Sequence, residues 1–94
     1  MLELVQIKQV GSNYSLNTLF VNPTHIVHLS EHREYSNKLR EGKMNLELNP
    51  ITSFTKVVVN EGDKSSEFIV VGEPSLIESK LNRSVGTKKQ ILRG

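Results

Sequence analysis

The chain has 94 residues and a net charge of +2, which fits one domain with a small hydrophobic core. It contains no cysteine, so disulfide bridges and thiolate metal sites are excluded, and a reducing compartment is expected. No run of about 18 apolar residues is present, and Glu3 and Lys8 interrupt the apolar start in a way that does not fit a signal peptide. These features predict a soluble cytoplasmic protein without a membrane segment.

The net charge conceals an asymmetry between two parts of the chain. Residues 1–79 hold seven Lys and Arg against all ten acidic residues, whereas residues 80–94 hold five basic residues and no acid. The five are Lys80, Arg83, Lys88, Lys89 and Arg93. Such basic ends occur where a protein meets nucleic acid or an acidic surface, and equally in solvated termini that aid solubility.

The first part of the chain has the pattern of strands. Residues 2–10 alternate between apolar and polar side chains, as in a half-buried strand. Residues 11–13 have turn chemistry, and residues 14–21 resume strand-type side chains up to the break at Pro23. A third strand is predicted over about residues 25–31.

The segment 22–42 admits two interpretations. Asn22-Pro23 and Gly42 could begin and end a helix, which would place all three histidines on one face. A helix held by packing needs a sustained apolar stripe, which this segment lacks. The pattern therefore favours the strand over 25–31 followed by a long polar loop over 33–43.

The second part of the chain predicts a hairpin and a helix. Two strands, 52–60 and 65–72, flank a loop that contains glycine, which is the clearest hairpin signal of the sequence. Pro74 at a helix start and the apolar pair Ile77 and Leu81 predict a short helix over 74–81. The remaining residues, 82–94, are interpreted as a basic tail.

Together these elements predict a single mainly β domain over residues 1–94. Five short strands with one short helix near the C-terminus are typical of a small, strongly bent antiparallel barrel of SH3-like or OB-like size. Because the core is small and such a barrel leaves strand edges, edge-to-edge pairing of identical subunits into a homo-oligomeric ring is expected.

Several stretches resemble the small flagellar FlbD-like proteins. The order FVNPTHIVHL, FTKVVVNEG, FIVV and PSLIESKL matches their N-P before an Ile-rich strand, their glycine hairpin and their short closing helix. The likeness covers about residues 16–81 and concerns strand and turn order. It implies a common topology more than a common role.

The whole chain is more similar to Sm/LSm-like RNA-binding barrels, in a family of ocean-metagenome and cyanophage type. The residues that carry this likeness are Glu41, Met44, Asn45 and Leu48, with Leu92-Arg93-Gly94 at the end. Glu41 stands where that family has aspartate. The resemblance implies a bent five-stranded barrel, a ring of identical subunits in the host cytoplasm, and loops that contact single-stranded RNA or DNA.

The sequence contains no motif that predicts catalysis or a cofactor. There is no G-x-S-x-G, no cysteine nucleophile, no Gly-rich phosphate loop before a helix and no H-E-x-x-H. On a strand, His25 and His28 point to opposite faces, and His28 and His32 lie about 13 Å apart. Three zinc ligands at about 2 Å cannot come from that arrangement, so no metal site is predicted unless the segment is helical.

The candidate nucleic-acid-binding residues are cations and one aromatic ring, in the polar loop and in the tail. They are Arg33, Tyr35, Lys38, Arg40 and Lys43 in the loop and Lys88, Lys89 and Arg93 in the tail. Single-strand binders combine a cationic track with rings on which bases stack. The predicted function is therefore non-catalytic binding of single-stranded RNA or DNA by a homo-oligomer, and the alternative is an assembly adaptor that binds protein partners.

Overall fold

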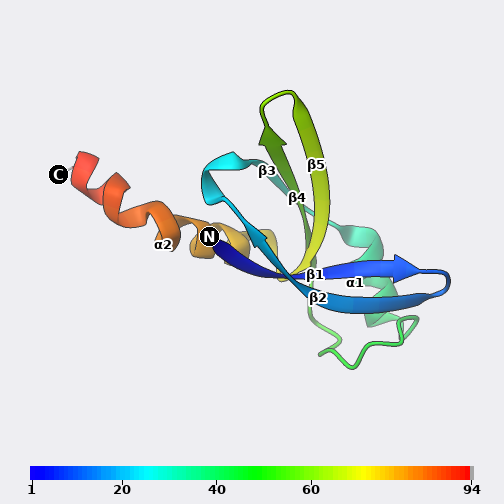
Figure 1. The fold of residues 1–94 in the computed structure, drawn as a ribbon. Helices are drawn as coiled ribbons and strands as arrows, with labels where there is room; N and C mark the ends of the chain where they lie inside the picture. The colour runs from blue at the N-terminus through cyan, green and yellow to red at the C-terminus, as the bar shows by residue number, and fades with distance from the viewer. Residues whose placement is uncertain (94) are drawn as a thin grey trace.

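Five antiparallel strands form one sheet in the computed structural model, which describes the backbone of residues 1–93 and the side chains of residues 1–83 (Figure 1). The strands are β1 (Leu2–Val10), β2 (Asn13–Val21), β3 (Ile26–Glu31), β4 (Phe54–Glu61) and β5 (Lys64–Val71). The helical elements are η1 (Pro23–His25), α1 (Arg33–Arg40) and α2 (Pro74–Arg93). The predicted mainly β class, with five antiparallel strands and a helix near the C-terminus, is confirmed.

Two tight hairpins build the sheet. β1 and β2 pair along their whole length and are joined at Gly11, whose φ of 64° suits a two-residue hairpin turn. β4 and β5 pair in the same way around Gly62. The hairpins meet where β1 pairs with β5, at Gln6 and Val70, and Figure 1 shows them crossing at a steep angle.

The predicted barrel is not formed, because the sheet stays open. The strand order is β2-β1-β5-β4-β3, so β2 and β3 are its two edges. The Asn22 side chain accepts the Thr24 N–H at 3.0 Å and caps η1, and this turn leads the chain away from β2. β3 then pairs with β4, with an irregular register between Ile26 and His28.

The sheet is covered on both faces by separate clusters of buried side chains. One cluster contains Leu2, Leu4, Val21, Val57, Val59, Val70 and Ile77. The other contains Ile7, Tyr14, Leu39 and Phe54. Strand alternation explains the division, since successive side chains point to opposite faces. Helix α2 covers the first cluster through Ile77, and α1 covers the second through Leu39.

The prediction of a loop over residues 33–43 was wrong, since most of this segment is helix α1. His32 caps the helix, with its Nδ1 accepting the Tyr35 N–H at 3.4 Å, and Gly42 (φ 72°) follows its end. A helix this short buries only Ser36 and Leu39, so it needs no long apolar stripe. Its apolar contacts come from across the sheet, which a local pattern cannot reveal.

Helix α2 is longer than the predicted 74–81. Its backbone continues to Arg93, so nearly all of the predicted tail is helical. Within the described residues, no helix has both the length and the apolar character that crossing a bilayer requires.

Ser36 provides a test of how α1 is held on the sheet. It is 1% exposed, and its hydroxyl accepts the Phe54 N–H at 3.1 Å and donates to the His32 carbonyl at 3.1 Å. Ser36→Ala leaves the buried Phe54 N–H without this partner, so we expect a loss of about 1–3 kcal/mol in the free energy of unfolding. Urea denaturation measures the loss.

Ser65→Ala is the matched control, because Ser65 is exposed on β5. We expect it to change the free energy of unfolding by less than about 0.5 kcal/mol. Equal effects of the two substitutions would contradict the role given to Ser36.

Candidate functional site

Tyr35, the aromatic candidate for base stacking, is packed into the second cluster. Its ring centroid lies 4.3 Å from that of His32, 5.3 Å from that of Tyr14 and 6.1 Å from that of Phe54. The last two contacts are edge-on, which is a favoured arrangement of buried rings. Much of the ring surface is therefore used inside the protein, where it holds α1 to β2 and β4.

The cations of the predicted loop lie beside acids or polar side chains. Lys38 Nζ lies 3.4 Å from a Glu34 carboxylate oxygen and donates to the Tyr14 hydroxyl at 3.2 Å. The other pairs are Arg33 with Glu31 at 3.7 Å, Lys43 with Glu41 at 3.2 Å, and Arg40 with Asn37 at 3.3 Å. The chain brings these cations to α1 and its C-terminal end, and acids are interspersed among them.

The tail candidates Lys88, Lys89 and Arg93 lie outside the residues whose side chains the structure describes. Their backbone belongs to α2. Only the positive charge of residues 80–94 supports these three residues as part of a binding site.

The histidines occupy three different settings. His32 caps α1, and His28 lies on β3 opposite Val58. His25 ends η1, with its Nδ1 3.5 Å from a Glu61 carboxylate oxygen. That nitrogen is buried, and the pair lacks the geometry of a hydrogen bond. In residues 1–83, no three histidine, aspartate or glutamate side chains gather as metal ligands would.

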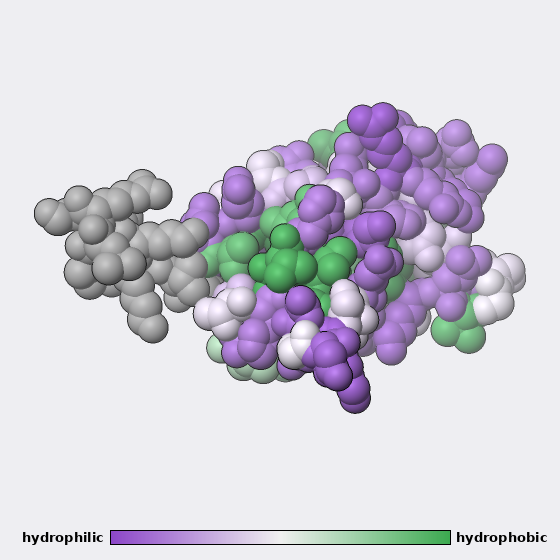
Figure 2. Space-filling model, turned by 90° about the horizontal axis from the view of Figure 1, so that it is seen from above, coloured by the Kyte–Doolittle hydropathy of each residue, from purple (hydrophilic) through white to green (hydrophobic). Residues whose placement is uncertain are grey.

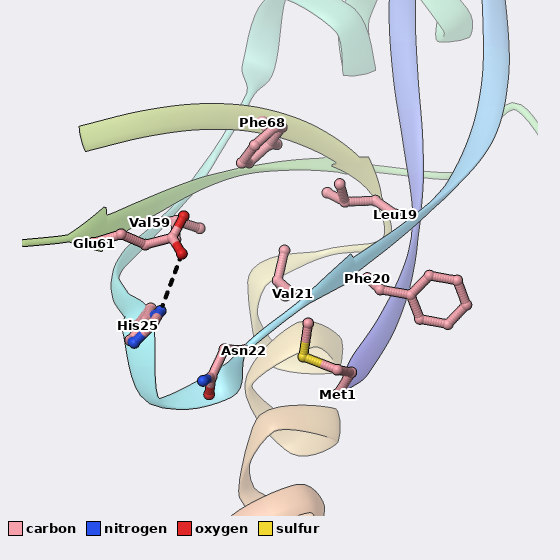
Figure 3. Close-up of a pocket in the computed structure, with 9 residues that line it drawn as sticks. All are labelled: Met1, Leu19, Phe20, Val21, Asn22, His25, Val59, Glu61 and Phe68. Atoms are coloured by element: carbon pink, nitrogen blue, oxygen red, sulfur yellow. Dashed lines mark ion pairs between the residues drawn. The ribbon is translucent and has the colours of Figure 1, made fainter. Parts of the chain in front are cut away.

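A small pocket lies between the end of β2 and the β4–β5 hairpin (Figure 3). Its volume is about 130 Å³, and its lining residues are Met1, Leu19, Phe20, Val21, Asn22, His25, Val59, Glu61 and Phe68. Leu19 and Val21 point into it, whereas the Phe20 ring is turned away. Ligand pockets usually measure roughly 300–1,000 Å³, so this pocket is too small for most metabolites.

The outward side of β2 lacks the features that usually protect a sheet edge. Its nine residues, NYSLNTLFV, contain no charged residue and no proline. Sheet edges are normally protected against pairing by lysine, proline, bulges or short length. β3, the opposite edge, has such protection, because it has six residues, an irregular register and Glu31.

The hairpin geometry shows which backbone groups β2 leaves unpaired with β1. In an antiparallel pair, alternate residues direct their N–H and C=O groups toward the partner strand. Tyr14 directs its groups outward, because its N–H donates to the Asn45 side-chain oxygen at 2.7 Å and its carbonyl accepts from the Asn45 side-chain nitrogen at 3.1 Å. By alternation, Leu16, Thr18 and Phe20 do the same.

Asn45 thus occupies one end of the β2 edge, as a strand residue would. At the other end, the strand stops before Pro23. Between these limits lies the open segment, residues 16–20. Leu16, Thr18 and Phe20 are exposed and share one face of the sheet, with Leu16 at 38% and Phe20 at 58% exposure.

Exposed apolar surface is concentrated on the same hairpin. Of the eight large apolar side chains exposed in residues 1–83, five belong to β1, β2 or the residue before them. They are Met1, Val5, Val10, Leu16 and Phe20. Apolar side chains also gather in the middle of the face of the molecule seen in Figure 2, where polar side chains surround them. Such patches are typical of interaction surfaces.

Comparison with protein-family models, with curated proteins and with solved structures finds no match. The open segment was not among the sequence-predicted sites. The signal for it was the absence of charge over residues 13–22, which has meaning only once β2 is known to be an edge.

The packing of α1 predicts a loss of stability at alkaline pH. Burial, with smaller effects of Tyr14 and Glu34, raises the pKa of Tyr35 above its ordinary 10.0. Hydrogen bonds to Tyr14 and Glu34 raise the pKa of Lys38 above its ordinary 10.5. The folded chain holds both protons more tightly than the unfolded chain, so these contributions are complete at neutral pH and are lost as the pH rises through the raised values.

Urea unfolding from about pH 8 to about pH 11 measures this dependence. We expect the free energy of unfolding to fall above about pH 10. The fall should be shallower in Tyr35→Phe, which lacks the titrating hydroxyl. Identical profiles for the two proteins would show that Tyr35 does not contribute.

Proposed function

We propose that the protein is a non-catalytic assembly module that associates with copies of itself through the free edge of β2. The observation that carries the proposal is the open segment, where outward backbone groups and exposed apolar side chains occur together without any charge. Adding a strand to such an edge supplies main-chain hydrogen bonds, and the side chains supply specificity.

The alternatives fit this edge less well. A nucleic-acid strand is recognised through its phosphates, which need cations, and β2 has none. A small molecule needs a larger pocket than the one beside β2. A strand of another protein needs only unpaired backbone groups and apolar surface, and the open segment offers both.

Replacing Phe20 tests the proposal. The protein should self-associate with rising concentration, and Phe20→Lys should shift it to the monomer. A lysine there is solvated in the monomer but must be desolvated beside a paired strand. Size-exclusion chromatography with light scattering, over a concentration series, measures the mass.

Val27→Lys is the matched control, since Val27 is 60% exposed on the other edge strand and Phe20 is 58% exposed. It should leave the mass unchanged. A wild-type protein that stays monomeric throughout the series, or an equal effect of the two lysines, would contradict the proposal.

Nucleic-acid binding is a second candidate, and a separate observation favours it. Residues 80–94 carry five basic residues and no acid, and Figure 1 shows α2 leading away from the sheet. A cationic helix of this kind would meet phosphates by charge, and self-association would multiply its few cations. We propose single-stranded RNA or DNA as this partner, bound apart from the β2 edge.

This candidate predicts salt-dependent binding that depends on the tail. Fluorescence anisotropy with labelled single-stranded RNA and DNA should show affinity that falls with salt. Lys88→Gln/Lys89→Gln/Arg93→Gln should reduce the slope of log K against log salt by about 2, since each phosphate contact contributes about 0.7. Arg40→Ala/Lys43→Ala is the comparison variant for the cations at the C-terminal end of α1. An unchanged affinity and salt dependence in the tail variant would show that the tail does not bind the nucleic acid.

A further inference from the structure

The open segment has fixed limits and a defined centre. Asn45 occupies the outward groups of Tyr14, and Pro23 lies just beyond the other end of β2. The residues with outward groups between these limits are Leu16, Thr18 and Phe20, and Thr18 is the middle one. A partner strand can therefore use three residues, evenly spaced about Thr18.

An antiparallel partner that is a second copy of β2 fits this arrangement. In a two-fold dimer the same surface is used on both subunits, so residues at equal distances from the axis face each other. With Thr18 on the axis, Thr18 faces its own copy and Leu16 faces Phe20 of the second copy. All three residues then find a partner for both backbone groups.

The side chains favour the same register. Leu16, Thr18 and Phe20 point to one face of the sheet, so each exposed Leu16 would lie directly across from an exposed Phe20. These contacts remove from water two of the exposed apolar side chains on each copy. No charge lies on either strand to oppose the approach.

Neighbouring registers use the edge less completely. Centring the pair on Asn17 would place Phe20 opposite Tyr14, whose outward groups Asn45 already occupies. Centring it on Leu19 would place Leu16 opposite Asn22, which caps η1 outside the strand. In either case one of the three open residues loses its backbone partners.

A ring would need a different contact, in which β2 of one copy pairs with β3 of the next. β3 has six residues against the nine of β2, and its register is irregular between Ile26 and His28. Such an edge offers no uninterrupted match for the open segment. The geometry therefore favours a closed two-fold dimer over the ring expected from the sequence.

We infer that two copies of the chain pair antiparallel along β2 with Thr18 on the two-fold axis, so that Leu16 packs against Phe20 of the second copy. This inference rests on the proposed self-association through β2. It goes further by specifying the symmetry and the register, which can fail while the association itself holds.

Cysteine pairing tests the register, because the chain has no cysteine of its own. Thr18→Cys should form a disulfide-linked dimer on mild oxidation, since directly opposed residues have Cα atoms about 5.5 Å apart, within the usual disulfide range. Non-reducing gel electrophoresis measures the yield. Circular dichroism checks that each variant folds, which is expected because Thr18 is exposed.

Two variants on the same strand are the controls. Ser15→Cys is exposed but would lie about 20 Å from its own copy, so it should stay monomeric on the gel. Asn17→Cys should link poorly. Efficient linking at Asn17 in place of Thr18 would overturn the register and leave the proposed function intact. Light scattering that finds wild-type monomer at every concentration would overturn both.

A charge exchange tests the contact between Leu16 and Phe20 independently. Leu16→Lys and Phe20→Glu should each raise the dimer dissociation constant by about tenfold or more. The double variant places lysine opposite glutamate at both contacts, so it should bind about tenfold more tightly than Leu16→Lys/Phe20→Lys, which places like charges there. Equal dissociation constants for the two double variants would overturn the proposed contact.

Discussion

The pairing of β1 with β5 at Gln6 and Val70 is the junction on which the rest of the structure depends. Val70 is fully buried, and the Gln6 side chain, nearly buried, accepts a hydrogen bond from Asn17 of β2. Because the strands meet over so short a length, the two hairpins can cross steeply. Each of the two buried clusters then contains side chains of both hairpins and one helix residue, Ile77 of α2 or Leu39 of α1. The same crossing leaves β2 and β3 as edges.

The edge strand β2 is held at its beginning by contacts that depend on α1. The segment expected to be a nucleic-acid loop is instead a short helix that brings Tyr35 against Tyr14 and leads into the turn that carries Asn45 to β2. Lys38 adds a hydrogen bond to the Tyr14 hydroxyl. Tyr35 and Lys38, two of the predicted nucleic-acid-binding residues, therefore fix the beginning of β2 against the rest of the protein. The end of β2 is held by Val21, which is buried in the first cluster, and it lies beside the pocket.

The sequence predicted the elements held by local patterns and missed those held by distant contacts. The alternating pattern of residues 2–10, and the glycine at Gly62 between two Val-rich strands, were sufficient to predict β1 and the β4–β5 hairpin. Helix α1 was missed because its buried residues, Ser36 and Leu39, find their partners on β4 and in the second cluster. The open edge was missed for a similar reason, since strand order depends on which strands pair. No local pattern states that Asn45 will bind the backbone of Tyr14.

An unprotected sheet edge promotes aggregation, because its unpaired backbone groups can pair with a strand of any other chain. This chain protects the edge of β3 with an irregular register, short length and a glutamate, and it covers Tyr14 with a side-chain amide. Protection stops at Leu16, Thr18 and Phe20, which are all exposed, and Leu16 and Phe20 are also apolar. An edge strand that served no specific contact would have unpaired outward backbone groups along its whole length. An edge that is covered at one end, ended by Pro23 at the other and uncharged between them has the dimensions of a specific contact, and its symmetry matches a second copy of itself.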